Sequence, residues 1–395
     1  MKILFLSRWL PYPANNGSKL RIYNLLCTLA TFHDVTLLSF CDEEPPQVDT
    51  THLESFCTSV HLVKWQPFNP KSKQAILGFF HRTPRSIIDT FSQTMANYIT
   101  NLINSDTYNL VIASELGMIA YSRFFSSIPA IAEDVELISL RELSMLAPTY
   151  KQKIRYTFTW MKYQLYLAKM LPYFNHCTVV SEQEKQILEQ VAPKFKKIEI
   201  VPNSINLNNY HNKHLTPKPN TLIFAGSFTY NVNYEGMLWF LEQVFPLILT
   251  QNPNVHLTIT GDHANLPLPS VANVHRSGFV DNIQAYIAES WASIVPIWSG
   301  SGTRLKILEA MALQTPVIST MKGAEGLNAI HNTHLLIADT PEQFAHCTLK
   351  LLSDSILRKE LASNAYKLVQ QQYNWATVST QFLNIVASTG TQCIQ

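Results

Sequence analysis

PIWSGSGTRLKILEAMALQTPVISTMKGAEGL, residues 296–327, combines a strand end, a small-residue loop, a helix and a second strand. The first strand ends at Ile297, and the loop 299–303 that follows contains two glycines. Glycines at a strand-to-helix turn let the backbone approach a ligand closely, and the free N–H groups at a helix start favour a phosphate group. The segment therefore predicts a βα unit whose loop binds an anion.

Three charged residues at the start of this helix are the candidate catalytic residues. Arg304 and Lys306 add positive charge to the first turn, where cations oppose the helix dipole and need a further reason such as a bound diphosphate. Glu309 follows among apolar neighbours, and its carboxylate can accept hydrogen bonds from both hydroxyls of a ribose. The same residues fit two solvated cations and an ordinary helix salt bridge, so the segment taken alone leaves both interpretations open.

Strands and helices alternate on both sides of this segment, which predicts parallel sheets with helices on both faces. In the first half, compact apolar strands are expected at residues 2–7, 34–40, 60–65, 109–114, 129–133, 177–181 and 198–201. In the second half, strands are expected at residues 221–225, 255–260, 274–277, 293–297, 316–320 and 334–338. Single helices are expected at residues 71–81 and 88–104. The expected fold is α/β, with two doubly wound Rossmann-like domains.

The domain boundary is expected near residue 205, where a proline and a polar stretch follow the last strand of the first half. We expect an N-terminal domain of residues 1–205 and a C-terminal domain of residues 206–373. A final helix within residues 374–395 is expected to pack back on the N-terminal domain. Ligands of open α/β sheets bind outside the carboxyl ends of the strands, so a cleft shared by the two domains is the expected site.

The composition excludes several classes of protein. With 395 residues, 46% of them hydrophobic, the chain can fill two cores, and its net charge of +2 argues against nucleic acid as the main partner. Six scattered cysteines and thirteen histidines without ligand spacing predict a reduced, cytoplasmic protein that needs no metal and no other cofactor. No window approaches the ~20 apolar residues of a membrane span.

The sequence LEAMALQTPVIST within the helix segment resembles glycosyltransferase family 4, the group 1 type. In that family the glutamate of LEAMA, here Glu309, binds the donor ribose. The first glutamate of the family motif stands eight positions earlier, where this sequence has Ser301. Residues 323–327, which include Glu325, match the family's loop after the next strand. The resemblance extends over nearly the whole chain and is most specific for residues 200–330.

The resemblance implies a GT-B fold, with two Rossmann-like domains facing each other across a cleft and the nucleotide sugar bound mainly by the C-terminal one. The donor-binding residues implied there are Gly226, Ser227, Ser301, Gly302, Thr303 and Glu325. After the glycine the family often has arginine and then lysine, whereas this sequence has Ser227 and neutral residues such as Asn233. Arg304 and Lys306 are therefore the candidates that meet the charge of the donor phosphates.

The N-terminal domain supplies two further groups of candidate residues. Gly17 and Ser18 begin a helix after the first strand, where the family has a loop that faces the donor phosphates; a plain surface turn also fits. Glu115 and Glu133 each follow a strand, so they are candidates on the acceptor side, as a base or as the group that orients a hydroxyl. Each of the two also fits an ordinary helix cap.

Residues 150–174 are basic and aromatic and contain no acid. Their cations are Lys151, Lys153, Arg155, Lys162 and Lys169. Helices of this kind lie on anionic lipid in peripheral membrane proteins. The segment fits equally well a helix that packs by its aromatic side and leaves its lysines in solvent. Peripheral contact with the inner face of a membrane is thus one of two expectations.

These patterns together predict a retaining glycosyltransferase of the hexosyltransferase type. It is expected to move a sugar from a UDP- or GDP-sugar to a hydroxyl of a glycan or lipid-linked acceptor, and the resemblance implies cell-surface polysaccharide synthesis. Two alternatives stay open: a sugar-nucleotide epimerase on the same fold, and a non-catalytic GT-B protein that binds a partner. Ser301 and the missing cations after Gly226 support the second alternative.

Overall fold

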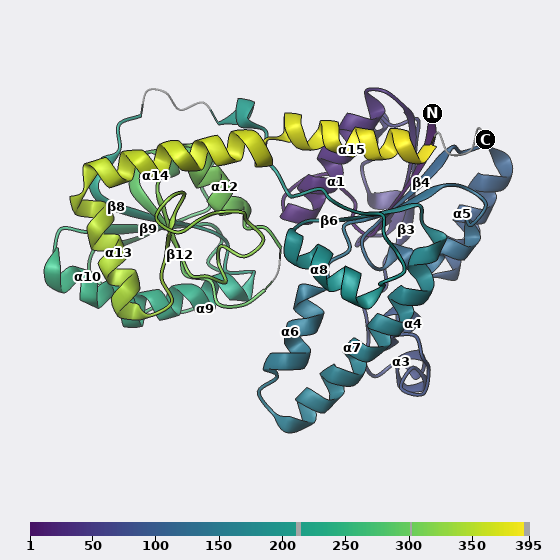
Figure 1. Cartoon of the computed structure of the whole chain (residues 1–395), viewed down its shortest axis with the longest axis horizontal. Coiled ribbons are helices and arrows are strands. Elements are labelled where there is room, and N and C mark those ends of the chain that lie inside the picture. The colour runs from purple at the N-terminus through teal and green to yellow at the C-terminus, as the bar shows by residue number, and fades with distance from the viewer. Residues whose placement is uncertain (211–214, 301, 391–395) are drawn as a thin grey trace. The chain divides into compact units, whose positions relative to one another are not determined.

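The chain folds into two α/β units (Figure 1). The computed structural model of the chain describes residues 1–210, 215–300 and 302–390. One unit consists of Met1–Pro202 with Ser379–Gln395, and the other consists of Asn203–Val378. We refer to them as the N-terminal unit and the C-terminal unit. Each contains one parallel sheet flanked by helices, which confirms the doubly wound α/β architecture expected from the sequence.

Among the described residues of the N-terminal unit, seven parallel strands form a sheet in the order β3-β2-β1-β4-β5-β6-β7. The strands are β1 (Lys2–Ser7), β2 (Asp34–Cys41), β3 (Ser59–Lys64), β4 (Leu110–Ser114), β5 (Ala130–Glu133), β6 (His176–Val179) and β7 (Ile198–Ile200). All residues of β1 after Lys2 are buried, because helices cover both faces of a central parallel strand. The strand order reverses between β1 and β4, and ligands of doubly wound sheets bind at such a reversal.

The helices of the N-terminal unit are α1 (Gly17–Ala30), α2 (Thr51–Glu54), α3 (Lys73–Leu77), α4 (Arg85–Asp89), α5 (Gln93–Ser105), α6 (Ile138–Leu146), α7 (Tyr150–Met170) and α8 (Glu182–Val191), with the 3₁₀ turns η1 (Pro45–Gln47), η2 (Met118–Phe124) and η3 (Leu171–Tyr173). Five α-helices in the described part of the N-terminal unit, α1, α3, α5, α7 and α8, begin after a residue whose side chain caps them. The helical range expected at residues 88–104 is confirmed for the most part but is interrupted: α4 ends at Asp89, and the Ser92 hydroxyl caps a new helix by accepting from the Met95 N–H at 3.2 Å.

In the described part of the C-terminal unit, six parallel strands follow the order β10-β9-β8-β11-β12-β13, which reverses between β8 and β11. The strands are β8 (Lys218–Ala225), β9 (His256–Thr260), β10 (Val274–Gly278), β11 (Ser290–Val295), β12 (Val317–Ser319) and β13 (Leu336–Ile337). The helices are η4 (Leu207–Asn209), α9 (Asn231–Trp239), the π-helical η5 (Phe240–Val244), α10 (Phe245–Gln251), α11 (Ile283–Ala288), α12 (Leu305–Ala312), α13 (Pro341–Ser353), α14 (Ser355–Leu368) and the π-helical η6 (Val369–Tyr373).

The last helix, α15 (Trp375–Gly390), adds its residues from Ser379 onward to the N-terminal unit. There the Gln381 side chain donates to the carbonyl oxygen of Ile200 at 2.7 Å. Near the helix end, the Thr389 hydroxyl and Nδ1 of His176 form a buried hydrogen bond of 2.7 Å. The end of the described chain therefore completes the packing of the unit in which the chain begins.

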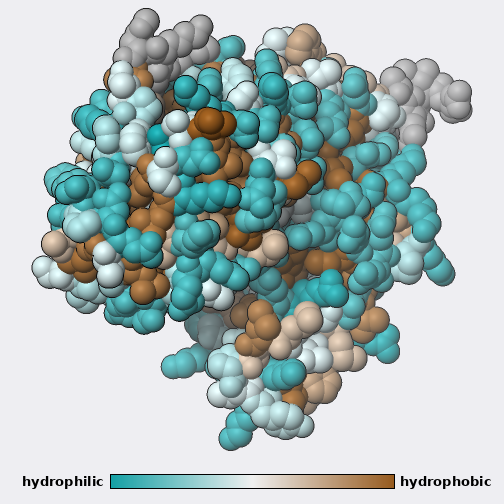
Figure 2. Space-filling view, turned by 60° about the vertical axis from the view of Figure 1, so that its left-hand side comes forward, coloured by the Kyte–Doolittle hydropathy of each residue, from teal (hydrophilic) through white to brown (hydrophobic). Residues whose placement is uncertain are grey.

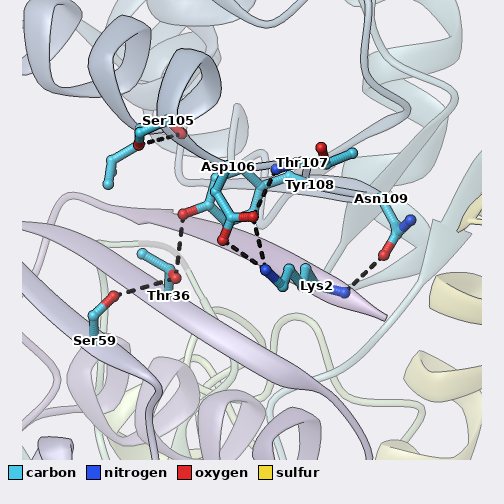
Figure 3. A network of polar contacts seen from close by, with 9 residues as sticks. Lys2, Thr36, Ser59, Ser105, Asp106, Thr107, Tyr108 and Asn109 are labelled. Atoms are coloured by element: carbon cyan, nitrogen blue, oxygen red, sulfur yellow. Dashed lines mark hydrogen bonds and ion pairs between the residues drawn. The ribbon is translucent and has the colours of Figure 1, made fainter.

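A polar network that is exposed at Lys2 and Asp106 and buried at Tyr108 and Thr36 lies at the amino ends of β1 and β4 (Figure 3). The Lys2 ammonium is 2.7 Å from the Asp106 carboxylate, and the Lys2 backbone N–H donates to Oδ1 of Asn109 at 2.8 Å. The Tyr108 hydroxyl donates to the Thr36 hydroxyl at 3.3 Å. Because ligands bind at the opposite, carboxyl ends of parallel strands, we assign this network to structure alone.

Gly236 in α9 packs against the segment that follows β11, and this contact supplies a stability prediction. A Cβ at Gly236 would overlap the carbonyl oxygen of Pro296. Gly236→Ala is therefore expected to lower the free energy of unfolding by about 2 kcal/mol through overpacking, measured by urea denaturation. A Cβ at Gly117 meets no atom within 4 Å, so Gly117→Ala is the matched control and should change little. Equal effects of the two substitutions would contradict the prediction.

Candidate functional site

Two loops meet at the strand-order reversal of the C-terminal unit. Strand β8 continues into residues 226–230, and the neighbouring β11 continues into a loop that starts at Pro296 and leads to α12. Both loops leave the sheet at the carboxyl ends of their strands, the edge at which open α/β sheets bind ligands. They frame a candidate site built from residues of the C-terminal unit.

The loop after β8 is fixed by its own polar contacts. The Ser227 hydroxyl donates to the carbonyl oxygen of Asp262 at 3.1 Å, and the Asn233 amide donates to the carbonyl oxygen of Ser227 at 2.6 Å. Gly261 has a φ of +100°, and a Cβ there would lie 2.8 Å from the carbonyl carbon of Gly226. Only glycine permits this close approach, which holds Gly226 and Ser227 at the sheet edge.

The loop after β11 turns through left-handed glycines. Gly300 and Gly302 have φ values of +85° and +84°, and a Cβ on Gly300 would collide with the Tyr230 hydroxyl of the other loop. The Arg304 guanidinium donates to the carbonyl oxygen of Ser299 at 3.0 Å, across the turn. The glycines therefore bring the two loops together and fold the Arg304 side chain back over its own loop.

The start of α12 differs in one respect from the sequence prediction. The helix begins at Leu305, so Arg304 is its N-cap rather than part of its first turn, and its side chain is largely buried. Thr303 is 7% exposed, and its Oγ1 forms no hydrogen bond with any described residue. Ser301 lies outside the described residues. Thr303 and Arg304 thus place a hydroxyl and a guanidinium directly before the helix.

The Lys306 side chain reaches from α12 to the loop after β8. Its Nζ donates to Oδ1 of Asn233 at 2.8 Å and lies 4.3 Å from the centre of the Phe224 ring. Burial first, and the nearby Arg304 guanidinium second, lower the pKa of Lys306 to about 7. The Lys306 ammonium from α12 therefore lies beside Asn233. The loop after β8 contains only neutral side chains, so Lys306 provides the positive charge that this loop lacks.

Glu309 lies farther along α12 and contacts the segment before β8. The Tyr210 hydroxyl donates to its Oε1 at 3.2 Å. Burial raises the pKa of Glu309 above its usual range, and the Tyr210 hydrogen bond and the Lys306 charge oppose that rise. Sequence reasoning missed Tyr210, because no pattern of local spacing connects two residues 99 positions apart.

Glu325 follows β12 at the same edge of the sheet. Its carboxylate pairs with the Lys322 ammonium, and both side chains are largely buried. Gly323 packs tightly at the end of β11, since a Cβ there would lie 2.8 Å from the carbonyl oxygen of Val295. The loop after β12 therefore packs against the end of β11. Glu325 lies at this edge of the sheet and forms an ion pair with Lys322 there.

In the N-terminal unit, Gly17 and Ser18 are the first two residues of α1, after the loop that leaves β1. The Asn16 side chain caps the helix by accepting from the backbone N–H of Lys19 at 3.0 Å. Gly17 is exposed and Ser18 is half-buried. The remaining N–H groups of this helix start lie at the ligand-binding edge of the N-terminal sheet.

Glu133 at the end of β5 forms a buried ion pair. Its side chain is fully buried, and its Oε1 accepts from Nε of the buried Arg21 at 2.8 Å. Its Oε2 accepts from the Ser114 hydroxyl at 2.6 Å. Both carboxylate oxygens are thus engaged inside the unit, which is the geometry of a structural ion pair.

Glu115 and Asp134 follow the neighbouring strands β4 and β5 in strained backbone conformations. Their φ values are +76° and +56°, in the left-handed region that costs a residue other than glycine about 1–3 kcal/mol. Burial raises the pKa of Glu115 well above its usual range, and the charge of Asp134 raises it further. Such strain and such pKa shifts gather at functional sites, so these two carboxyls are candidate functional groups at this edge. Sequence reasoning named Glu115 and Glu133 but not Asp134.

Arg8, directly after β1, is a further cation that sequence reasoning missed. Its guanidinium carbon lies 4.1 Å from the ring centre of Trp9 and 3.8 Å from that of Trp65, which places it between two aromatic side chains. Its Nη2 is 3.6 Å from the Asp42 carboxylate. Its Nη1 is buried and forms no hydrogen bond with the described residues. Burial lowers the pKa of Arg8, while Asp42 and Glu115 oppose that change.

Known proteins are similar to the C-terminal unit in sequence and to the whole chain in fold. Residues 219–354 match the family model for glycosyl transferases group 1. An uncharacterized 44.6 kDa protein in the cps region of Klebsiella pneumoniae is 24% identical over 94% of this chain and 96% of its own. The structure of Anabaena HepE in complex with UDP has a TM-score of 0.67 at 14% identity, covering 98% of this chain and 100% of that one.

Sucrose-phosphate synthase from Thermosynechococcus elongatus has a TM-score of 0.69 at 14% identity, covering 98% of this chain and 99% of that one. At this identity the two solved structures establish the fold alone. The family match covers the loops and the helix that carry Gly226, Arg304, Lys306 and Glu309. The chain therefore has the GT-B fold, and residues 219–354 of its C-terminal unit match the model for glycosyl transferases group 1, the family that the sequence resembles.

Proposed function

We propose that the chain transfers a sugar from a nucleoside diphosphate sugar, UDP-linked in the first instance, to a hydroxyl of a glycan or lipid-linked acceptor. The observation that carries this proposal is the pair of cations, Arg304 and Lys306, beside two glycine-shaped loops at the strand-order reversal of a group 1 domain. A diphosphate bound there gains two charges and the free N–H groups at the start of α12. The relative from a cps region supports a role in polysaccharide synthesis.

In this proposal the two cations act on the leaving group. Negative charge grows on the departing diphosphate as the bond to the sugar breaks, and Arg304 and Lys306 stabilise it in place of a metal ion. Glu309 accepts hydrogen bonds from the ribose hydroxyls. The hydrogen bond from the Tyr210 hydroxyl holds the Glu309 carboxylate in position for this contact. Ser227, Gly302 and Thr303 contribute loop N–H groups and hydroxyls to the same ligand.

On the acceptor side we propose Glu115 as the group that orients or deprotonates the incoming hydroxyl. Burial raises the pKa of Glu115 well above its usual range, which favours its protonated form and suits a group that exchanges a proton, whereas Glu133 is held by Arg21 and Ser114. Retention of configuration at the anomeric carbon is part of the proposal and rests on the resemblance to the family. Gly17 and Ser18 are proposed to face the donor phosphates for the same reason.

The test is transfer of radiolabelled sugar from UDP- and GDP-linked donors to lipid-linked and soluble glycan acceptors, with and without EDTA. Product that forms only with an acceptor would support sugar transfer, and its formation in the presence of EDTA would support a reaction without a metal ion. Retention of the donor's anomeric configuration, measured by NMR, would support the retaining mechanism. Conversion of the donor to its epimer without acceptor would replace it with the epimerase alternative. Nucleotide binding without turnover over the whole panel would favour a non-catalytic binding protein.

The affinity for UDP is expected to fall by up to tenfold per pH unit as the pH rises above 7. In the free protein the Lys306 amine titrates near pH 7, and a bound diphosphate favours its charged form, so binding at higher pH takes up a proton. Calorimetry at pH 8 in two buffers of different ionisation enthalpy should show uptake of about 0.9 proton. Lys306→Met should remove this uptake. Equal uptake by both proteins would assign it to another group.

A further inference from the structure

Part of the N-terminal unit forms a helical lobe with a groove in it. The lobe consists of residues 68–89, which contain α3 and α4, and residues 138–170, which contain α6 and α7. A groove of about 740 Å³ runs between these helices and is lined by Arg85, Leu143 and Phe158 among others. None of the helices in the described part of the chain is long and apolar enough to cross a bilayer.

The turn after α3 is fixed in a conformation that leaves a large apolar side chain in solvent. Lys162 of α7 donates to the carbonyl oxygen of Phe79 at 2.8 Å, and the Arg85 guanidinium carbon lies 3.6 Å from the centre of the Phe79 ring. These contacts tie the turn after α3 to α7 and α4. The next residue, Phe80, is 92% exposed.

Exposed apolar side chains are concentrated on this lobe, and Figure 2 shows tan and brown side chains gathered on its lower part. Ten large apolar side chains of the described residues are exposed by 60% or more, and six of them belong to the lobe. The six are Leu77, Phe80, Leu146, Tyr150, Phe158 and Leu165. Exposed apolar side chains gathered on one part of a protein are typical of an interaction site.

The charge of the lobe is predominantly positive. Residues 68–89 contain four lysines and arginines and one acid, Asp89, and residues 138–170 contain six lysines and arginines and one acid, Glu142. Because the whole chain is only +2, the lobe's net charge of +8 leaves the rest of the chain at −6. The molecule is therefore strongly polarised in charge, with its positive end on the segments that expose the apolar side chains.

We propose that this lobe docks on the surface of a bilayer that contains anionic phospholipid. The apolar side chains enter the boundary between headgroups and acyl chains, the groove receives part of an acyl chain, and the cations around it contact the lipid phosphates. Charge complementarity selects this occupant, because a lobe that exposes apolar side chains and carries a net charge of +8 matches an anionic lipid surface. The docking is independent of the proposed sugar transfer, and its test measures vesicle binding alone.

The test is flotation of the full chain with two kinds of vesicle. One contains only neutral phosphatidylcholine, and the other also contains about 30% anionic phosphatidylglycerol. Binding is expected for the anionic vesicles and should weaken as salt rises. Lys151→Gln with Lys153→Gln should weaken it about 30-fold, since each cation near an anionic surface contributes roughly fivefold. The matched control is Lys194→Gln with Lys196→Gln, an exposed pair with the same spacing outside the lobe, which should change binding little.

The apolar contribution has its own matched pair. Phe158→Ser should weaken vesicle binding about tenfold, whereas Phe32→Ser, which removes a ring of similar exposure (64% against 60%) outside the lobe, should not. Unchanged melting temperatures would show that all four variants fold. Equal binding to neutral and anionic vesicles, equal losses in the controls, or no vesicle binding would each overturn the proposal. If the chain bound no vesicles but formed a dimer that Phe158→Ser abolished, the exposed apolar surface would instead bind a second copy of the chain.

Discussion

Lys306→Met should lower kcat/KM for sugar transfer about a hundred- to a thousandfold, yet unfold at the same temperature as the wild type or a higher one. The activity falls because one preorganised cation no longer stabilises the departing diphosphate. The stability holds because burial depresses the pKa of Lys306 to about 7, which means that its charged form is unfavourable in the folded protein. Methionine keeps the apolar stem and removes that charge, which offsets the lost hydrogen bond to Asn233.

The pH dependence of unfolding gives the sign of this effect. The unfolded chain binds a proton at Lys306 up to its ordinary pKa of 10.5, whereas the folded chain releases it above about 7. Between these values the unfolded state holds more protons, so the contribution of this lysine to stability rises with pH in the wild type and is absent in Lys306→Met. Lys367→Met, at an exposed lysine of α14, is the control and should change neither property. A large fall in melting temperature of Lys306→Met would contradict the account.

Arg21→Ala should lower the free energy of unfolding by about 3–5 kcal/mol, the cost of leaving a buried carboxylate without its partner. The side chains of Arg21 and Glu133 are 4% and 0% exposed, so water cannot replace the guanidinium. Chemical denaturation measures the loss. The second substitution Glu133→Gln in the same chain should restore part of it, because the uncompensated charge is then gone.

The exposed pair of Figure 3 is the matched control for this prediction. Lys2 and Asp106 form the same type of ion pair in the same unit, but their side chains are 49% and 42% exposed. Lys2→Ala should therefore barely move the denaturation midpoint, since exposed ion pairs contribute little. Similar losses from Arg21→Ala and Lys2→Ala would show that Glu133 is not confined by its buried partner, and would return it to the acceptor candidates.

The fold was predictable because its signals are local. Parallel strands buried on both faces are short apolar runs, and the run 2–7 coincides with β1 (Lys2–Ser7). The break between α4 and α5 was missed, since a serine cap within an apolar helical pattern is a weak signal next to the periodicity around it. The position of Arg304 before the first helical residue depends on the conformation of the glycine loop, which its composition does not specify.

The candidate site was predictable only in part, because its partners are distant in sequence. The resemblance named Glu309 and, through a deficit of charge after Gly226, Lys306. Nothing in the chain order connects Lys306 with Asn233, 73 residues before it, or Glu309 with Tyr210. The sequence named Glu115 but neither its backbone strain nor the strained Asp134, since a positive φ at an acidic residue follows from the packing of two neighbouring strand ends.

The central claim is that the C-terminal unit binds a nucleoside diphosphate through α12 and the loops before it. The most direct test is a thermal-shift titration of the wild type and Glu309→Ala with UDP, GDP and ADP, with Glu360→Ala at an exposed acid of α14 as control. A ligand that binds only the folded state raises the melting temperature. The account predicts that one nucleotide stabilises the wild type and Glu360→Ala, and that Glu309→Ala binds it about a hundredfold more weakly, having lost a charged acceptor for the ribose. Stabilisation by none of the three, or equal stabilisation of Glu309→Ala, would contradict it.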